Sequence, residues 1–189
     1  PRKGSDTLVA ALSLLVRRRD PAPVLAVLGG HSFQDHRAYR ERVRASFGPL
    51  GLTAGRDVVE VGTVPESEMA AWYAAADVLA FPSVKEGFGL AALEAMAAGV
   101  PVVTSDLPVF REWLVPGRDA LTAPVGDAEA LADALAAVLD DADLAVRLRR
   151  AGRRLAARFT WTASAERHLA VYARRDVALA NAGGGQPPP

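Results

Sequence analysis

The sequence predicts an α/β fold, a Rossmann-like parallel sheet with helices on both faces. Short, almost entirely apolar runs alternate with amphipathic stretches along most of the chain. That alternation is typical of strands that lie buried beneath crossover helices. Half of the 189 residues are hydrophobic, which is enough to cover such a sheet with a core of useful size.

The predicted strands are short and lack the alternation of a half-exposed sheet. They span residues 24–28, 58–61, 78–81 and 101–104, with a weaker one near Leu121. Helices are predicted at 5–16, 38–47, 66–75, 90–98 and 109–115, most with apolar residues at three- and four-residue spacing. From Asp127 onward the pattern is helical, with breaks near Asp140 and Thr160.

The two ends of the chain differ from a complete domain of this kind. A helix is predicted almost at the first residue with no strand before it, so we expect a fragment whose first strand precedes Pro1. Residues 1–180 are expected to form one domain. Residues 181–189, which include Gly-Gly-Gly-Gln-Pro-Pro-Pro, are expected to form a disordered tail. No internal repeat is apparent.

Charge and composition narrow the classes of partner. The 22 basic residues balance the 22 acidic ones, and Arg17-Arg18-Arg19 is the longest basic tract, so the field that attracts nucleic acid is missing. No apolar run reaches the length that spans a bilayer. The chain has no cysteine, which excludes disulfides and thiolate metal sites. We therefore expect a cytoplasmic protein that binds no nucleic acid and has no transmembrane segment.

A glycine-containing loop provides the first candidate for a binding site. Gly87 and Gly89 follow the third predicted strand and lead into the helix at 90–98. In an open parallel sheet, ligands bind where strands end and helices begin. Glycines let a backbone approach a ligand closely and adopt positive φ. The unpaired amides of the first helical turn, residues 88–91, would attract an anion such as phosphate.

Two glutamates flank this loop. Glu86 precedes it, and Glu94 lies in the first or second turn of the following helix, where side chains lean back toward the loop. A carboxylate repels phosphate, but it accepts hydrogen bonds from vicinal hydroxyls that are worth about 1.5–3 kcal/mol each. Carboxylates beside a phosphate site therefore indicate a ligand with both groups, a sugar nucleotide.

Other interpretations use the same residues. Glu86 could be a solvated loop residue, and Glu94 could simply complement the helix dipole. The run Gly87-Phe88-Gly89-Leu90-Ala91-Ala92 fits the dinucleotide fingerprint, with Asp106 placed to hold a ribose, as in an NAD(P)-binding domain of an oxidoreductase. Against this, residues 82–86 separate the strand from the first glycine. A third alternative is a nucleotide-binding module without catalytic activity.

The longer motif resembles a known enzyme family. Glu-Gly-Phe-Gly-Leu-Ala-Ala-Leu-Glu, followed by Ala-Met-Ala-Ala-Gly-Val-Pro-Val-Val, is similar to the E-x7-E signature of family 4 retaining glycosyltransferases. The resemblance extends from about Lys3 to Tyr172 and includes Pro1-Arg2-Lys3-Gly4, Tyr73-Ala74-Ala75-Ala76-Asp77 and Phe159-Thr160-Trp161. The chain looks like the C-terminal, donor-binding half of a two-domain GT-B enzyme.

This resemblance implies a role for each matching residue. Glu94 binds ribose hydroxyls, and Glu86 binds hydroxyls of the transferred sugar near the reacting carbon. Lys3 neutralises the diphosphate leaving group, so Glu86 and Lys3 are the candidate catalytic residues. The backbone at Val64 lies along the base. The sugar hydroxyls and the distal phosphate are held by the amides of Gly87, Phe88, Gly89, Leu90 and Ala91.

The resemblance also implies a mechanism without a protein nucleophile, a cofactor or a metal. The sugar keeps its anomeric configuration, and the leaving phosphate assists the acceptor hydroxyl. Asp141-Ala142-Asp143 spells the D-x-D of metal-dependent glycosyltransferases, but it lies between two predicted helices, where we interpret it as a helix cap. The acceptor site, and any peripheral membrane contact, would belong to the absent N-terminal half.

Some positions depart from the family or are ambiguous. The arginine that usually accompanies the lysine several residues earlier falls before the chain begins, and Ala120 stands where the family often has glycine. Gly29-Gly30-His31 follows a predicted strand and is compatible with either a phosphate contact or a plain turn. Trp72 and Trp161 are predicted to anchor the core.

Overall fold

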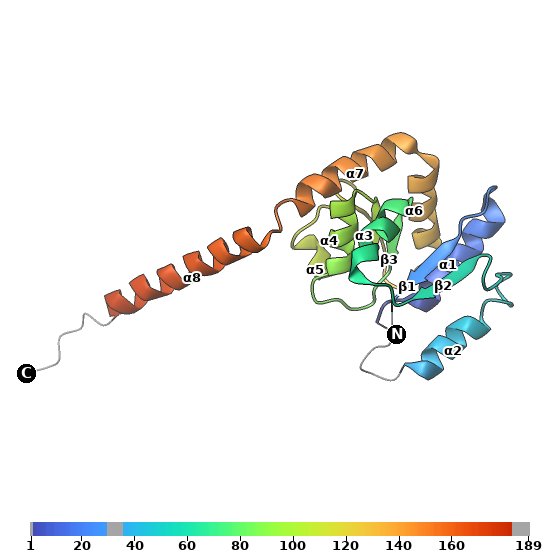
Figure 1. Ribbon diagram of the computed structural model, residues 1–189, viewed down its shortest axis with the longest axis horizontal. Coiled ribbons are helices and arrows are strands. Elements are labelled where there is room, and N and C mark those ends of the chain that lie inside the picture. Colours follow the sequence, from blue (N-terminus) through green and yellow to red (C-terminus); the bar gives the residue numbers. More distant parts are fainter. Residues whose placement is uncertain (1, 30–35, 183–189) are drawn as a thin grey trace, which may run out of the picture.

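The computed structural model describes residues 2–29 and 36–182, in which helices and parallel strands alternate (Figure 1). The elements are α1 (Ser5–Arg18), β1 (Leu25–Leu28), α2 (Arg37–Ala45), β2 (Val58–Gly62), α3 (Glu66–Ala75), β3 (Leu79–Phe81), α4 (Leu90–Ala98), β4 (Val102–Ser105), α5 (Pro108–Arg111), β5 (Leu121–Ala123), α6 (Ala128–Asp140), α7 (Ala142–Ala156) and α8 (Trp161–Ala182). Every predicted strand and helix is present, although the helix predicted at 109–115 is shorter and ends at Arg111. The predicted fold class is confirmed.

The strands divide between two parallel sheets. In one, β4 lies between β3 and β5; in the other, β1 pairs with β2 so that Leu25 faces Val58. In the described part of the chain, β1 and β3 are not hydrogen-bonded to each other. This changes the burial of the strands: β4 is buried throughout, whereas Ala26 and Val27 of β1 are exposed. An apolar strand with one neighbour cannot reach the burial that is typical of a parallel sheet.

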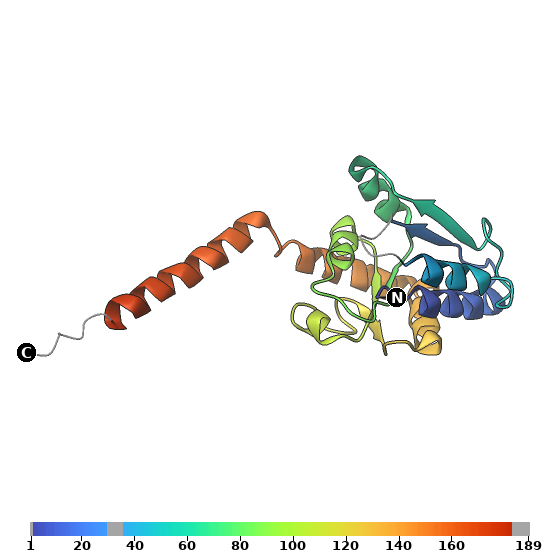
Figure 2. The same cartoon turned by 90° about the horizontal axis from the view of Figure 1, so that it is seen from below.

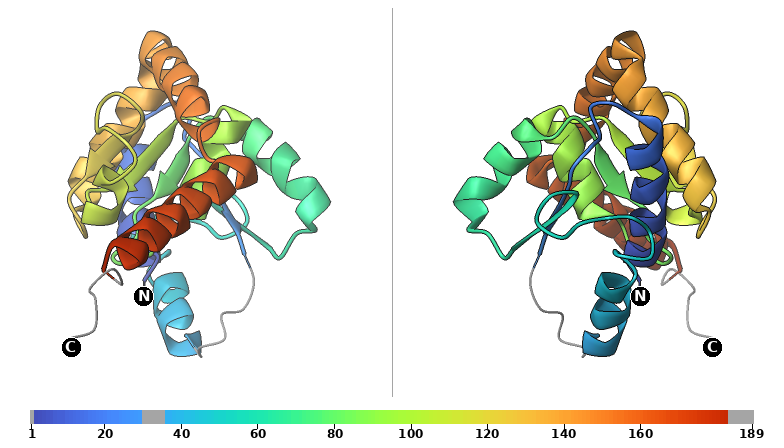
Figure 3. Two further views of the ribbon diagram at one scale, coloured as in Figure 1. Left: turned by 90° about the vertical axis from the view of Figure 1, so that its left-hand side faces the viewer. Right: turned by 90° about the vertical axis from the view of Figure 1, so that its right-hand side faces the viewer.

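Helices cover both faces of the sheet formed by β3, β4 and β5 (Figure 3). Val102 and Val103 are adjacent in β4 and point to opposite faces, as pleating requires. Val103 packs in a cluster with residues of α1 and α6, and Val102 packs with residues of α4 and α5. Both valines are fully buried.

Helix α1 holds the two sheets together. Its residues Ala11 and Leu15 pack into the cluster on the sheet of β4, and Val9 and Leu12 pack with Val58 of the other sheet. The apolar side chains of α1 therefore pack against both sheets. The residues directly before α1 are fixed relative to both sheets as a consequence.

Two turns with the same sequence, Gly-Arg-Asp, lead into β2 and β5. Asp57 and Asp119 are 5% and 3% exposed, and each carboxylate accepts the amide of the residue four positions earlier, at 2.7 and 2.9 Å. Each also pairs with the preceding arginine, Arg56 or Arg118. The chain therefore uses the same three-residue turn twice, once before β2 and once before β5.

Helix α8 projects away from the body of the molecule (Figures 1 and 2). Trp161 begins this helix and is 92% exposed, so the prediction that it anchors the core was wrong. Helical spacing alone does not show which helices pack on the body. The helix extends through Asn181 and Ala182, two residues into the expected tail, and residues 183–189 lie outside the described residues. Among the helices that the structure describes, none is both long and apolar enough to cross a bilayer.

Candidate functional site

The candidate site is built on the loop between β3 and α4, residues 82–89. Gly89 caps α4 in a left-handed conformation with φ 93°, and a Cβ added to it would lie 2.5 Å from a ring carbon of Phe110. Only glycine fits there. Gly87 does not use the positive φ that glycine permits, and a Cβ added to it would meet no atom within 4 Å. Gly87 therefore leaves open space rather than a special turn.

The amides at the start of α4 have the arrangement expected of an anion site. The amide of Ala92 donates to the carbonyl of Gly89, and in the described residues no acceptor is found for the amides of Leu90 and Ala91. First-turn amides that lack a partner carry the positive end of the helix dipole. They can donate to a ligand that approaches the loop.

The N-terminal segment runs beside this loop. The amide of Val84 donates to the carbonyl of Arg2 at 2.8 Å, and a Cβ on Gly4 would lie 2.0 Å from the carbonyl oxygen of Pro82. Gly4 has φ 65°, which suits glycine alone. These contacts fix Lys3 next to a loop that is distant in sequence.

Lys3 and Glu86 form an ion pair. Lys3 Nζ lies 2.5 Å from Glu86 Oε2 and 4.7 Å from the centroid of the Phe81 ring. The Glu86 side chain is 16% exposed and the Lys3 side chain 56%. Two of the predicted site residues are thus in direct contact across 83 positions of sequence.

Further hydrogen bonds hold the Glu86 carboxylate. Oε1 accepts the amide of Gly87 at 3.2 Å, and Oε2 also accepts the hydroxyl of Ser83 at 3.4 Å. Partial burial raises the pKa of Glu86, but the hydrogen bond and charge of Lys3, with smaller contributions from Gly87 and Ser83, leave this pKa below its ordinary value. Glu86 is therefore an ionised acceptor at neutral pH.

Glu94 lies on the exposed side of α4 and has a different partner. The hydroxyl of Tyr73, on the neighbouring helix α3, donates to Glu94 Oε2 at 3.0 Å. Burial, followed by the hydrogen bond and charge of Glu94, raises the pKa of Tyr73 far above its ordinary value. Tyr73 belongs to a motif shared with the family, but no role for it was predicted, because nothing in the sequence indicates contact between α3 and α4.

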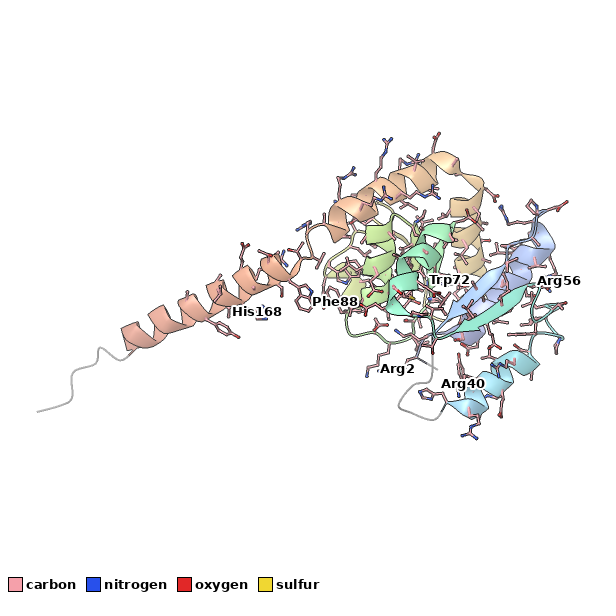
Figure 4. The ribbon with its side chains drawn as sticks, in the orientation of Figure 1. Arg2, Arg40, Arg56, Trp72, Phe88 and His168 are labelled. Carbon is pink, nitrogen blue, oxygen red and sulfur yellow. The ribbon has the colours of Figure 1, made fainter. Side chains whose placement is uncertain are left out.

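Aromatic contacts of Phe88 also hold the loop at 82–89 in place. Its ring stacks on Trp113 at 5.6 Å between centroids and meets Phe159 edge-on at 5.8 Å, close to the point where α7 gives way to α8 (Figure 4). Trp113 Nε1 donates to the carbonyl of Phe88 at 3.1 Å. Trp113 was likewise not predicted as a site residue, because its contact with the loop at 82–89 depends on the path of the chain after α5.

Other predicted positions lie elsewhere or have other partners. Val64 is half-buried in the turn between β2 and α3, and in the described residues no hydrogen bond joins it to the loop at 82–89. Gly29 follows β1 and its amide donates to the carbonyl of Gly62, while Gly30 and His31 lie outside the described residues. Trp72 is half-buried.

Asp106 and Asp141 belong to motifs that could bind a dinucleotide or a metal, and in the structure both carboxylates have protein partners. Asp106, the ribose ligand of the dinucleotide interpretation, forms a two-point ion pair with Arg111, whose hydrogen bond lowers the pKa of Asp106. Asp141 of the D-x-D sequence caps α7 by accepting the amide of Leu144 at 2.8 Å, as predicted. In the described residues, no three His, Asp or Glu side chains gather in a way that could hold a metal ion.

Comparisons with known proteins agree with the geometry. A family model described as glycosyl transferases group 1 matches residues 1–141. A D-inositol 3-phosphate glycosyltransferase from Jonesia denitrificans is 36% identical over 180 residues, which cover 94% of this chain and 42% of that protein. A GDP-mannose-dependent alpha-(1-6)-phosphatidylinositol monomannoside mannosyltransferase from Mycobacterium tuberculosis is 36% identical over 186 residues, covering 94% and 46%.

Solved structures give the same result. A sucrose-phosphate synthase from Thermosynechococcus elongatus has a TM-score of 0.79 and 34% identity, with 94% of this chain and 43% of that chain covered. Anabaena Alr3699/HepE in complex with UDP and glucose has a TM-score of 0.79 at 22% identity, covering 92% and 45%, and supports the fold alone. The chain spans slightly less than half the length of these proteins. No oxidoreductase is among the relatives described, and the dinucleotide interpretation is set aside.

Proposed function

The chain belongs to the group 1 glycosyl transferases, and we propose that it is the donor-binding domain of a retaining glycosyltransferase that needs no metal. Its donor is a nucleoside-diphosphate sugar, and the reaction moves that sugar to an acceptor hydroxyl. The observation that carries this proposal is the ion pair between Lys3 and Glu86 beside the loop at 82–89. The pair places an ammonium group that can bind phosphate next to a carboxylate that can bind hydroxyls.

The proposed roles of the other residues are those that the resemblance to this family implies. Glu94 accepts hydrogen bonds from the ribose hydroxyls, and the backbone at Val64 lies along the base. The amides of Gly87, Phe88, Gly89, Leu90 and Ala91 hold the sugar hydroxyls and the distal phosphate. The amides of Leu90 and Ala91, for which no acceptor is found in the described residues, and the open space at Gly87 support this arrangement.

The transfer breaks the bond between the anomeric carbon and the phosphate oxygen, and its electron pair goes to the diphosphate. The acceptor oxygen forms the new bond to the same carbon on the same face, and the hydroxyl proton moves to the leaving phosphate. Negative charge therefore develops on the diphosphate. Lys3 and the amides of α4 stabilise that charge, so that positioning and electrostatics supply the catalysis without a metal.

The chain spans less than half the length of its relatives, which supports a further domain as its partner. We propose that an N-terminal domain of the same enzyme supplies the acceptor site and any peripheral membrane contact. A relative at 36% identity is named as GDP-mannose-dependent, which supports a nucleoside-diphosphate hexose as the class of donor. The cytoplasmic location expected from the sequence stays a prediction.

Calorimetric titration of the 189-residue chain tests the proposal. UDP, GDP and ADP are titrated separately, each with and without an attached hexose, into the wild type and into Glu94→Ala. Loss of the hydroxyl contacts should weaken nucleotide binding by about 1–3 kcal/mol, roughly fivefold to 150-fold. Glu129→Ala is the matched control, because Glu129 is an exposed first-turn glutamate of α6 outside the site.

The outcomes separate the candidate functions. Binding of one nucleotide that Glu94→Ala weakens and Glu129→Ala does not would support the donor site. Unchanged affinity in Glu94→Ala would favour a nucleotide-binding module whose glutamates do not touch the ligand. If none of the six compounds binds, the proposal is wrong for this domain.

A further inference from the structure

Tyr73 and Glu94 form a pair that no role proposed so far explains. The Tyr73 hydroxyl lies 3.0 Å from Glu94 Oε2, and it comes from α3, which packs beside α4 (Figure 1). The Tyr73 ring packs against the buried cluster that includes Ala92, Ala95 and Met96 of α4. The ring is therefore held by the core while its hydroxyl reaches the carboxylate.

An exposed glutamate needs such support if it is to bind a ligand precisely. A free glutamate side chain loses rotamer entropy when it is fixed. If one oxygen is already bound to a rigid donor, part of that loss occurs on folding rather than on binding. The other oxygen, Glu94 Oε1, has no protein partner in the described part of the chain and remains available.

The direction of the hydrogen bond matters as much as its length. A phenol can donate or accept, but an ionised carboxylate only accepts. Burial and the neighbouring Glu94 raise the pKa of Tyr73, so its hydroxyl stays protonated and donates throughout the neutral range. The contact therefore orients Glu94, and the second oxygen is left as an acceptor for a ligand.

We propose that Tyr73 is a positioning residue that orients the Glu94 carboxylate toward the vicinal hydroxyls of the nucleotide's ribose. Tyr73 does not touch the ligand; it acts through Glu94. The inference rests on the proposed function, because it assumes that Glu94 binds ribose. It adds that α3 takes part in selecting ribonucleotides.

The test compares two ligands that differ only in the ribose hydroxyls. The nucleoside diphosphate that binds the wild type, among UDP, GDP and ADP, is titrated alongside its 2′,3′-dideoxy analogue. The wild type should prefer the ribonucleotide by about tenfold or more, the loss expected when a charge-assisted contact is removed. Tyr73→Phe keeps the ring and removes the donor. It should reduce that preference by about threefold to tenfold and leave binding of the dideoxy analogue unchanged.

The chain offers a matched control for the same substitution. Tyr39 on α2 donates to Asp6 Oδ1 at 2.9 Å, a tyrosine–carboxylate pair outside the site. Tyr39→Phe should keep the full preference for the ribonucleotide. The double variant Tyr73→Phe/Glu94→Ala should bind no more weakly than Glu94→Ala alone, since Tyr73 acts through Glu94.

A measurement on the wild type does not depend on how the variants fold. In protein carrying ¹³C-labelled tyrosine, the Cζ resonance of Tyr73 should shift when the ribonucleotide binds and shift less with the dideoxy analogue. An equal shift with both ligands would count against the inference. So would a Tyr73→Phe variant that keeps the wild-type preference or that loses affinity for both ligands equally. A wild type that binds both ligands equally would instead overturn the proposed role of Glu94 itself, and with it the inference.

Discussion

Alanine substitutions at Gly87 and Gly89 should have opposite effects, although the two glycines belong to one loop. A Cβ on Gly89 would lie 2.5 Å from Phe110 Cε1, and Gly89 has φ 93°. Gly87 does not have positive φ, and a Cβ there would meet no protein atom within 4 Å. We therefore expect Gly89→Ala to damage folding and Gly87→Ala to damage binding.

The cost at Gly89 has two parts. An alanine in a left-handed conformation costs about 1–2 kcal/mol. Overpacking against Phe110, which is 1% exposed, adds about 1–3 kcal/mol. The free energy of unfolding should fall by about 2–5 kcal/mol in total. Gly55→Ala isolates the first part, because Gly55 has φ 80° with no neighbour within 4 Å, and should cost about 1–2 kcal/mol.

At Gly87 we expect an alanine to leave the fold stable but to weaken ligand binding. An alanine in a compatible conformation reduces the entropy of the unfolded chain, which stabilises the protein by up to about 1 kcal/mol. In the complex, however, the new methyl group would occupy space that we assign to the donor sugar and its phosphate. Affinity for the nucleoside-diphosphate sugar should fall at least about tenfold, the loss of roughly one hydrogen-bond contact.

Urea unfolding followed by circular dichroism measures the stability of all three variants, and calorimetric titration measures donor binding by Gly87→Ala. Wild-type affinity in Gly87→Ala would show that the ligand does not approach the backbone at this point. A Gly89→Ala protein no less stable than Gly55→Ala would show that the packing against Phe110 is not a constraint. Either result would refute the corresponding step of the reasoning.

Two further predictions concern charged side chains. Glu86→Gln should tighten binding of the bare nucleoside diphosphate by about threefold to tenfold in calorimetry, because it releases Lys3 from the ion pair; weaker binding would contradict this. Asp119→Asn should destabilise the protein by about 1–2 kcal/mol at pH 7. Burial raises the pKa of Asp119, but the hydrogen bonds from Arg118 and the amide of Val115, with the charges of Arg118 and Arg154, together lower this pKa in the folded protein. Its contribution is present above the unfolded pKa of about 3.9 and is lost as the pH falls through the folded pKa, so urea unfolding at pH 3 should show a smaller difference.

The sequence predicted the fold well because its signal is local. Buried parallel strands need apolar residues on both faces, and their crossover helices need an apolar stripe, so each element carries its own pattern. The division into two sheets was not predicted, because pairing of β1 with β2 and of β3 with β4 depends on contacts between distant segments. The position of α8 was missed for the same reason: Trp161 has the pattern of a core residue and no core to contact.

The site was predicted in part. The glycines and glutamates stand close together in sequence, and their chemistry points to a sugar nucleotide. The residues that fix them come from elsewhere: Tyr73 from α3, and Trp113 from the segment after α5. An aromatic side chain with one polar atom serves equally well in a core or in a hydrogen bond. The sequence alone does not distinguish the two.

In this structure, the two charged groups Lys3 and Glu86 of the candidate site are already paired with each other. The contact of Tyr73 with Glu94 leaves the second oxygen of Glu94 available, so only the pair of Lys3 and Glu86 must separate when a donor binds. Binding of a donor would therefore exchange contacts rather than create all of them, and the ammonium must leave one carboxylate oxygen to meet a phosphate. Such an exchange limits affinity for the nucleotide alone, because part of each gain is offset by a lost contact. It favours a ligand that carries phosphate and hydroxyls together, since only that ligand satisfies both Lys3 and Glu86 after they separate.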